Sequence, residues 1–228
     1  MIKKIDIMGI LLDDYTVREA LHQIESLSDD NVLRSIESIS MQMLMEAEQD
    51  EELRNAISSL DLAIVGQKEI LEVAGAGTMQ RIKETEENDF FYEFLKRLER
   101  NHKRLFLLGE TEEKNNRIKE KLIEQYPQLS IVGEYALENC IGDQAAVINE
   151  MNAATPDLVL SVLPSPTQEH FFWEHKDKIS ARIWYGVGDV EIDGRMGVKK
   201  MVTSLLHRGR LKSSIEKYEK KKKNKMAL

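Results

Sequence analysis

The amino-acid sequence predicts an α/β protein with a mainly parallel sheet, helices on both faces, and a basic helical appendage at the C-terminus. Short apolar runs of strand length alternate with segments of helical periodicity, and several of these runs end in glycine or in a helix-capping residue. Such alternation favours a parallel sheet because the chain returns to the same edge through a helix. We therefore expect an α/β domain at residues 1–194 and a basic amphipathic appendage at residues 195–228.

In the first half of the chain, strands are expected at residues 4–10, 32–39 and 60–65. Thr16 and Glu19 form a capping-box pattern at the start of a helix, and Ser40 is placed to cap another. The run at 60–65 is apolar throughout, as in a strand buried on both faces. The glycines at 75 and 77 indicate a break before a long charge-rich helical stretch ending near Arg100.

In the second half, strands are expected at residues 104–109, 129–135, 157–163 and 182–187. Pro127 ends the first intervening helix, and two more helices are expected at residues 143–153 and from the loop at 164–167 to about residue 178. The whole pattern is that of a Rossmann-like domain.

Charge is unevenly distributed along the chain. Residues 208–228 contain nine Lys or Arg and two Glu, a balance of +7, so the net charge of −8 leaves −15 on the first 207 residues. An acidic body repels nucleic acid and anionic lipid, so no nucleic-acid partner is expected and any membrane contact is expected through the tail.

Cys140 is the single cysteine, which excludes an internal disulfide and favours a reducing compartment. No apolar stretch reaches the roughly 20 residues that span a bilayer. We expect a cytoplasmic protein that meets a membrane, if at all, only from its surface.

In parallel sheets, ligands bind outside the carboxyl ends of the strands. That rule selects five segments, at residues 38–42, 65–68, 109–111, 164–169 and 186–189. Their glycines permit close approach of a ligand to the backbone, although turns need glycines for their own geometry as well.

Several motifs together resemble one family. They are Asp6-Ile7-Met8-Gly9-Ile10, Leu105-Phe106-Leu107-Leu108-Gly109, Tyr126-Pro127-Gln128-Leu129, Pro156-Asp157-Leu158-Val159, Ser165-Pro166-Thr167-Gln168-Glu169 and Gly186-Val187-Gly188. In order and spacing, over most of residues 3–190, the chain resembles the WecG/TagA/CpsF glycosyltransferases.

The resemblance implies inverting transfer of a sugar of the N-acetylmannosamine type from a UDP-sugar to a lipid-linked saccharide. The acceptor belongs to cell-surface polysaccharide or teichoic acid synthesis, and neither a metal nor a cofactor is implied besides the UDP-sugar co-substrate. A possible homo-oligomer is implied as well.

The resemblance also implies a set of catalytic residues, and this sequence differs from the family at the position of the expected base. The family's Asp, the expected base, falls on Gly66, and Glu69 is a possible substitute nearby. The family pattern Thr-x-Asn-Pro-Glu corresponds to residues 38–42, so Ser38 and Ser40 keep hydroxyl groups while Gln42 replaces a carboxylate.

The resemblance also implies a set of substrate-binding positions: Gln42, Arg81, Gly109, Gln168, Glu169, Gly186 and Gly188. Arg81 and Ile82 match the family segment Arg-Val-x-Gly only loosely. Glu110 and Asp189 stand beside rim glycines, where carboxylates would repel a diphosphate. Glu169 could equally serve as a partner of its own helix dipole.

A basic amphipathic helix is typical of binding to a membrane surface. The expected membrane-contacting residues are Arg208, Arg210, Lys212, Lys220, Lys221 and Lys222. The alternative is a helix packed on the body with a solvated end. Two functions stay open: a divergent glycosyltransferase, or a catalytically impaired relative that binds a nucleotide sugar or a partner glycosyltransferase at the membrane.

Overall fold

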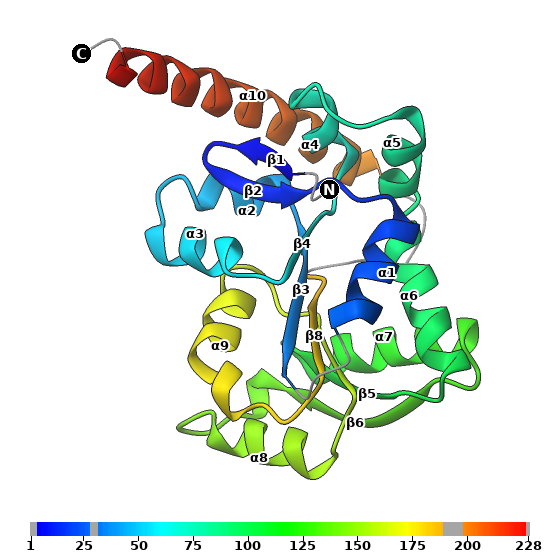
Figure 1. The fold of residues 1–228 in the computed structure, drawn as a ribbon. Coiled ribbons are helices and arrows are strands. Elements are labelled where there is room, and N and C mark those ends of the chain that lie inside the picture. Colours follow the sequence, from blue (N-terminus) through cyan, green and yellow to red (C-terminus); the bar gives the residue numbers. More distant parts are fainter. Residues whose placement is uncertain (1–3, 28–31, 189–197, 227–228) are drawn as a thin grey trace.

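The computed structural model describes residues 4–27, 32–188 and 198–226. Eight strands form one sheet in the order β1-β2-β4-β3-β8-β7-β5-β6 (Figure 1). They are β1 (Lys4–Ile7), β2 (Ile10–Asp13), β3 (Arg34–Ile39), β4 (Leu62–Val65), β5 (Arg104–Gly109), β6 (Ser130–Ala136), β7 (Leu158–Ser161) and β8 (Ile183–Gly186). Every neighbouring pair is parallel except β1 and β2, which confirms the predicted fold class.

Ten α-helices connect and cover the strands within the described residues. They are α1 (Val17–Leu27), α2 (Met41–Glu46), α3 (Glu51–Ser58), α4 (Lys68–Val73), α5 (Met79–Glu86), α6 (Asp89–Arg100), α7 (Glu112–Gln125), α8 (Ala145–Ala153), α9 (Thr167–His175) and α10 (Val198–Met226). The predicted capping residues are confirmed at α1, where the Thr16 and Glu19 side chains bond reciprocally, and at α2, where Ser40 accepts the Met43 N–H.

The single strand expected at residues 4–10 is wrong, because the chain reverses within it. Met8 and Gly9 adopt positive φ values of 53° and 85°, and they join β1 and β2 as an antiparallel hairpin. Two consecutive left-handed residues form the tight turn that suits the twist of such a hairpin. The Asp6 side chain accepts the Gly9 N–H at 2.7 Å and fixes the turn.

The long helix expected up to Arg100 is two helices, α5 and α6. Asn88 between them has a φ of 56°, a left-handed conformation that ends one helix and lets the next start in a new direction. This break places the first turn of α6 and the last turn of α5 beside the end of β4, where they enclose part of the site described below.

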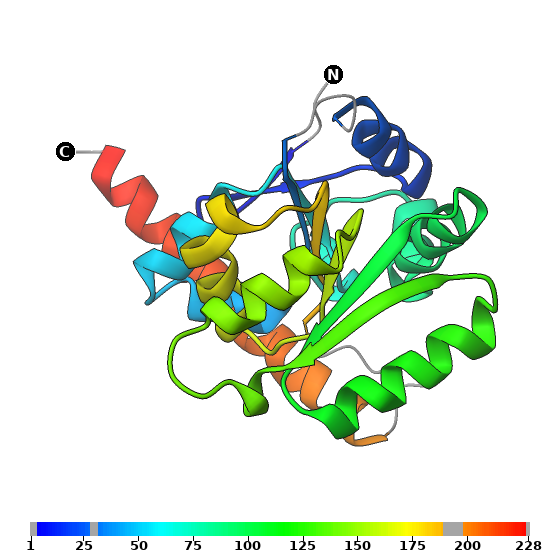
Figure 2. The same cartoon turned by 90° about the horizontal axis from the view of Figure 1, so that it is seen from below.

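Helices cover both faces of the sheet (Figures 1 and 2). One apolar cluster joins α1, α6 and α7 to one face, with Phe90, Phe91 and Phe94 packed around the buried Tyr185. On the opposite face, α8 and α9 pack around Trp184, while α2, α3 and α4 cover the β1-β2-β4 end.

Helix α10 packs on the body through its apolar stripe. Leu211 is fully buried, and Ile215 and Tyr218 lie against the cluster that contains α2 and α4. Arg208 pairs with Glu72 at 2.9 Å, and Lys222 lies 3.6 Å from Asp6. The C-terminal end of α10 projects past the body in both views (Figures 1 and 2). Asp189 and the expected domain boundary at 194/195 lie outside the described residues.

Candidate functional site

The predicted rim segments meet at one edge of the sheet because β4, β3, β8, β7 and β5 run parallel. Their order determines how far apart the segments are. Gly66 follows β4, next to Ser38 at the end of β3, whereas Gly109 ends β5, four strand spacings or about 19 Å from β4. The residues closest together are therefore those that follow β4, β3 and β8.

A small cavity of about 20 Å³ lies beside Gly66. Its wall includes Ser38 from β3, Gly66 after β4, Phe90 from α6, and Arg81 and Glu84 from α5. A cavity of this size holds about one water molecule or one hydroxyl group. The cavity thus brings together three of the predicted positions: Ser38, Gly66 and Arg81.

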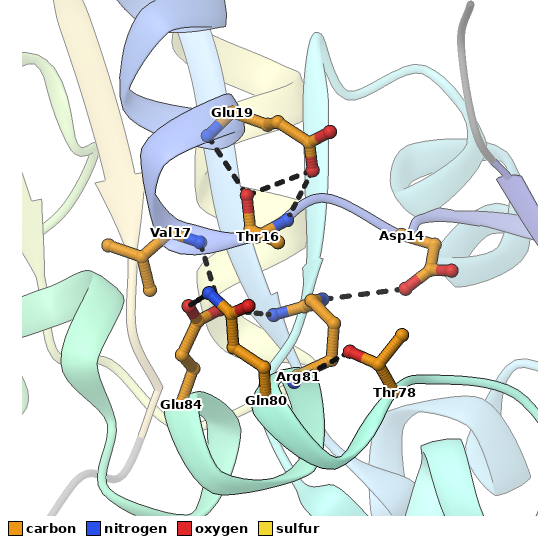
Figure 3. Close-up of polar contacts among 8 residues, drawn as sticks. All are labelled: Asp14, Thr16, Val17, Glu19, Thr78, Gln80, Arg81 and Glu84. Carbon is orange, nitrogen blue, oxygen red and sulfur yellow. Dashed lines mark hydrogen bonds and ion pairs between the residues drawn. The ribbon is translucent and has the colours of Figure 1, made fainter.

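Arg81 is held by two carboxylates and keeps one donor free. Thr78 caps α5 by accepting the Arg81 N–H, and the guanidinium is buried at 6% exposure. Its Nε lies 3.4 Å from Asp14 Oδ1 and its Nη1 3.6 Å from Glu84 Oε2 (Figure 3). Nη2 is buried with no hydrogen-bond partner in the described structure. Because buried donors are normally satisfied, Nη2 is a site for a water or ligand oxygen.

Glu84 also ties α5 to the start of α1. Its Oε2 accepts the Val17 N–H at 3.1 Å, and its Oε1 accepts from Gln80 Nε2 at 2.7 Å (Figure 3). Sequence reasoning did not select Glu84. Its position in the sequence could have indicated it, because Glu84 follows the candidate Arg81 by three residues. Residues three apart on a helix lie on the same face.

Ser38 forms the other polar wall of the cavity. Its hydroxyl lies 3.0 Å from that of Tyr185, whose ring is enclosed by the phenylalanines of α6. Burial raises the pKa of Tyr185, an effect that its hydrogen bond to Ser38 opposes. Tyr185 is therefore a neutral phenol that fixes the orientation of Ser38.

Gly66 is held close to β3 by its backbone. Its N–H donates to the Ile39 carbonyl at 2.9 Å, and a Cβ at this position would lie 3.0 Å from the same oxygen. A side chain at position 66 thus requires a small backbone shift. Gln67 accepts the Met41 N–H at 2.7 Å, so Ser40 and Gln67 both serve as caps of α2.

The remaining predicted residues near this end lie away from the cavity. Gln42 is exposed on α2, where its amide donates to Glu46 at 2.8 Å. Glu69 lies in the first turn of α4 and is not among the described residues that line the cavity.

A second polar cluster lies on the other face of β3. Glu37 is buried and accepts a hydrogen bond from Gln168 Nε2, while Gln168 Oε1 accepts the Gly188 N–H at 3.2 Å. Glu169, also buried, lies close to Glu37, and neither of its carboxyl oxygens has a hydrogen-bond partner in the described structure. Burial first, and then the neighbouring Glu169, raise the pKa of Glu37 well above its ordinary value. Burial also raises the pKa of Glu169.

The other rim glycines are covered by side chains. A Cβ on Gly186 would lie 2.5 Å from Gln168 Nε2, and one on Gly109 would overlap Asn115. Glycine is therefore needed at both positions so that side chains from neighbouring helices can fit. Gly188, which has a φ of 66°, is more open, because a Cβ there would meet no described atom within 4 Å.

The expected membrane-contacting residues lie along α10. Arg208, Arg210, Lys212, Lys220, Lys221 and Lys222 are exposed. In the part of the chain that the structure describes, no helix is both long enough and apolar enough to cross a membrane.

Comparison with known proteins identifies the family. The sequence model described as "Glycosyl transferase WecG/TagA/CpsF family" matches residues 5–193. The chain is 22% identical over 195 residues to N-acetylglucosaminyldiphosphoundecaprenol N-acetyl-beta-D-mannosaminyltransferase from Staphylococcus aureus (strain MRSA252). That match covers 81% of this chain and 73% of the relative. Because the family model matches far more than half of the chain, this chain belongs to the WecG/TagA/CpsF glycosyltransferase family.

Proposed function

We propose that this protein transfers a sugar of the N-acetylmannosamine type from a UDP-sugar to a lipid-linked saccharide during cell-surface polysaccharide or teichoic acid synthesis. Family membership supports the reaction type, and the name of the staphylococcal relative supports the sugar and the lipid-linked acceptor. The observation that carries the proposal is the unpartnered Nη2 of the buried Arg81, beside Ser38 and Gly66 at the carboxyl edge of the sheet.

The chemistry of sugar transfer requires such groups. Charge develops on the departing diphosphate, and a fixed cationic donor stabilises it. Arg81 is positioned by Asp14 and Glu84 before any ligand arrives, so little reorganisation is needed when an oxygen binds to Nη2. The hydroxyl of Ser38 borders the cavity beside Arg81, and this cavity has room for about one hydroxyl group of a sugar.

A transfer assay with the purified full chain tests this proposal. We expect release of UDP that depends on a polyprenyl-diphosphate-linked N-acetylglucosamine acceptor, together with UDP-sugar binding by calorimetry. Arg81→Lys should weaken donor binding or lower the rate by about tenfold or more, because lysine cannot reproduce the fixed fork of guanidinium donors. Lys83→Arg, on the exposed side of the same helix, is the matched control.

The alternative function, a catalytically impaired relative that binds a nucleotide sugar, is favoured by one observation: position 66 carries no side chain. Binding of the UDP-sugar without UDP release would support it. Gly66→Asp tests whether a carboxylate there adds activity, and Gly66→Ala must accompany it. The alanine separates the new acid from the backbone shift caused by the Ile39 carbonyl at 3.0 Å.

We further propose that the basic side of α10 holds the protein at the inner face of the cell membrane. Because Leu211, Ile215 and Tyr218 face the body, the attraction would be electrostatic, about 1 kcal/mol for each basic residue near an anionic surface.

Sedimentation with phosphatidylglycerol vesicles should show binding that is lost when Lys220, Lys221 and Lys222 are all changed to Glu. It should also weaken in high salt. Changing Lys83 and Lys96, which are exposed on the body, is the control. Unchanged binding of the tail variant would refute this part of the proposal.

A further inference from the structure

A carboxylate faces the same cavity as Gly66. Of the described residues that line this cavity, Glu84 alone is acidic, and it comes from α5 rather than from the strand end that carries Gly66. The side chain of Glu84 is 14% exposed, so it is enclosed by protein and still reachable. The cavity between Glu84, Ser38 and Gly66 is about the size of one hydroxyl group.

We propose that Glu84 is the general base of the transfer reaction, placed on α5 instead of at position 66. This inference rests on the proposed function and names a residue that the family resemblance did not indicate. In the Arg-Val-x-Gly segment that Arg81 and Ile82 match, position 84 corresponds to the glycine. A carboxylate is thus absent at position 66 and present at position 84, and both positions border one cavity.

The contacts of Glu84 leave it able to accept a proton. A carboxylate has about four lone-pair positions. Two of those of Glu84 accept hydrogen bonds from Val17 N–H and Gln80 Nε2, and Arg81 Nη1 lies 3.6 Å away as an ion pair, which leaves lone-pair positions for an incoming hydroxyl. These contacts also fix the orientation of the carboxylate beside Arg81, whose Nη2 has no hydrogen-bond partner in the described structure.

In the proposed step, Glu84 takes the proton from the attacking hydroxyl of the acceptor sugar. The hydroxyl oxygen then forms a bond to the anomeric carbon of the donor. The bond from that carbon to the diphosphate oxygen breaks, and its electron pair leaves with UDP. The proton passes from Glu84 to water after the products depart. Atoms and charge balance without any further reactant.

The deciding comparison is between the full chain and its Glu84→Gln variant. Glutamine keeps an oxygen for the Val17 N–H, and Gln80 can turn its amide to present its own oxygen. We expect kcat to fall by about 10²- to 10⁴-fold, the usual effect of losing a general base. Because Asp14 still pairs with Arg81 in this variant, affinity for the UDP-sugar should stay within about threefold. The acid limb of the kcat–pH profile should disappear. Glu87→Gln, an exposed carboxylate at the end of the same helix, should behave as the unchanged chain.

Each outcome has a separate meaning. If the unchanged chain neither binds nor consumes a UDP-sugar, the proposed function is wrong. If it transfers sugar and Glu84→Gln keeps its kcat within about threefold, only the assignment of Glu84 is wrong.

Should Glu84→Gln fail to fold, Glu84→Asp decides, because it keeps the charge and withdraws the carboxylate by one methylene. A kcat equal to that of the unchanged chain would then overturn the assignment, and a tenfold or greater loss with intact donor binding would support it.

Discussion

The two polar regions beside β3 differ in how their charges are balanced. Ser38 and Glu37 are neighbours in sequence, yet successive residues of a strand point to opposite faces of the sheet. On the Ser38 side, Arg81 lies between two carboxylates and retains a free donor. On the Glu37 side, two buried carboxyl groups meet an amide, and no cation pairs with them among the described residues.

The difference shows which region offers an unused hydrogen-bond donor to a ligand oxygen. The Arg81 region has a fixed positive group whose unused donor a phosphate or sugar oxygen can satisfy. The Glu37 region repels anions unless it binds a proton, and its hydrogen bonds run inward to Gln168 and the turn at Gly188. We therefore assign chemistry to the first region and shaping of the rim to the second.

Removing the cation should have the largest effect. Arg81→Met leaves Asp14 and Glu84 without their shared partner, and we expect the free energy of unfolding to fall by about 3 kcal/mol. Urea denaturation measures this change. Lys83→Met removes an exposed cation from the same helix and should change stability by less than about 0.5 kcal/mol. Equal effects of the two variants would contradict the conclusion that Arg81 is buried and stabilised by its pairs with Asp14 and Glu84.

Adding a side chain in the Glu37 region should lower the free energy of unfolding by somewhat less than Arg81→Met does. The Cβ of Gly186→Ala would lie 2.5 Å from Gln168 Nε2 and 2.8 Å from Glu37 Oε1, so both side chains must move. We expect a loss of about 2 kcal/mol in thermal or urea unfolding. Gly209→Ala, where a Cβ meets nothing within 4 Å, is the control and should be neutral or slightly stabilising. A neutral Gly186→Ala would show that the cluster is loosely packed.

The third effect is a dependence of stability on pH that arises from the Glu37 region. The raised pKa values of Glu37 and Glu169 mean that the folded chain binds a proton more tightly than the unfolded chain. The stability contributed by this proton binding is therefore fully present when the pH is below the ordinary carboxyl pKa. It is lost as the pH rises through the folded-state pKa, at about 1.4 kcal/mol per pH unit for each proton.

Glu37→Gln imitates the protonated acid permanently. The free energy of unfolding of the variant should therefore fall less steeply as the pH rises, and it should exceed that of the unchanged chain at pH 8. Urea denaturation at several pH values measures this. Glu174→Gln, on the exposed side of α9, should leave the pH dependence as it was. Parallel stability curves for Glu37→Gln and the unchanged chain would rule out the buried proton.

The smallest effect is expected at the wall of the cavity. Ser38→Ala leaves the buried hydroxyl of Tyr185 without its partner at 3.0 Å, at a cost of about 1 kcal/mol. Tyr185→Phe removes the other partner. The double variant should be destabilised by less than the sum of the two single variants, because both single changes break one bond. Strict additivity would mean that the two hydroxyls do not interact.

Much of this architecture could be predicted from the sequence because it depends on local patterns. The apolar run of β4, the caps at Thr16 and Ser40 and the glycine-ended β5 each follow from adjacent residues. The hairpin at Met8 and Gly9 was missed because its continuous apolar alternation resembles one strand, and only backbone φ values reveal the turn.

The candidate site was only partly predictable. Ser38, Gly66 and Arg81 were selected by motif and lie together. Glu84 was not selected, because its proximity to Gly66 depends on how α5 packs against the end of β4. The contact between Glu37 and Gln168 joins residues 131 positions apart, and nothing in either local sequence indicates it.

The sequence by itself determined the succession of strands and helices, the parallel sheet and the family, because these follow from periodicity and motif order along the chain. Tertiary structure alone decided which charged groups share a cavity and which carboxyl groups are buried side by side. Those outcomes depend on distances between elements and on exclusion of water, and both exist only after the elements have packed.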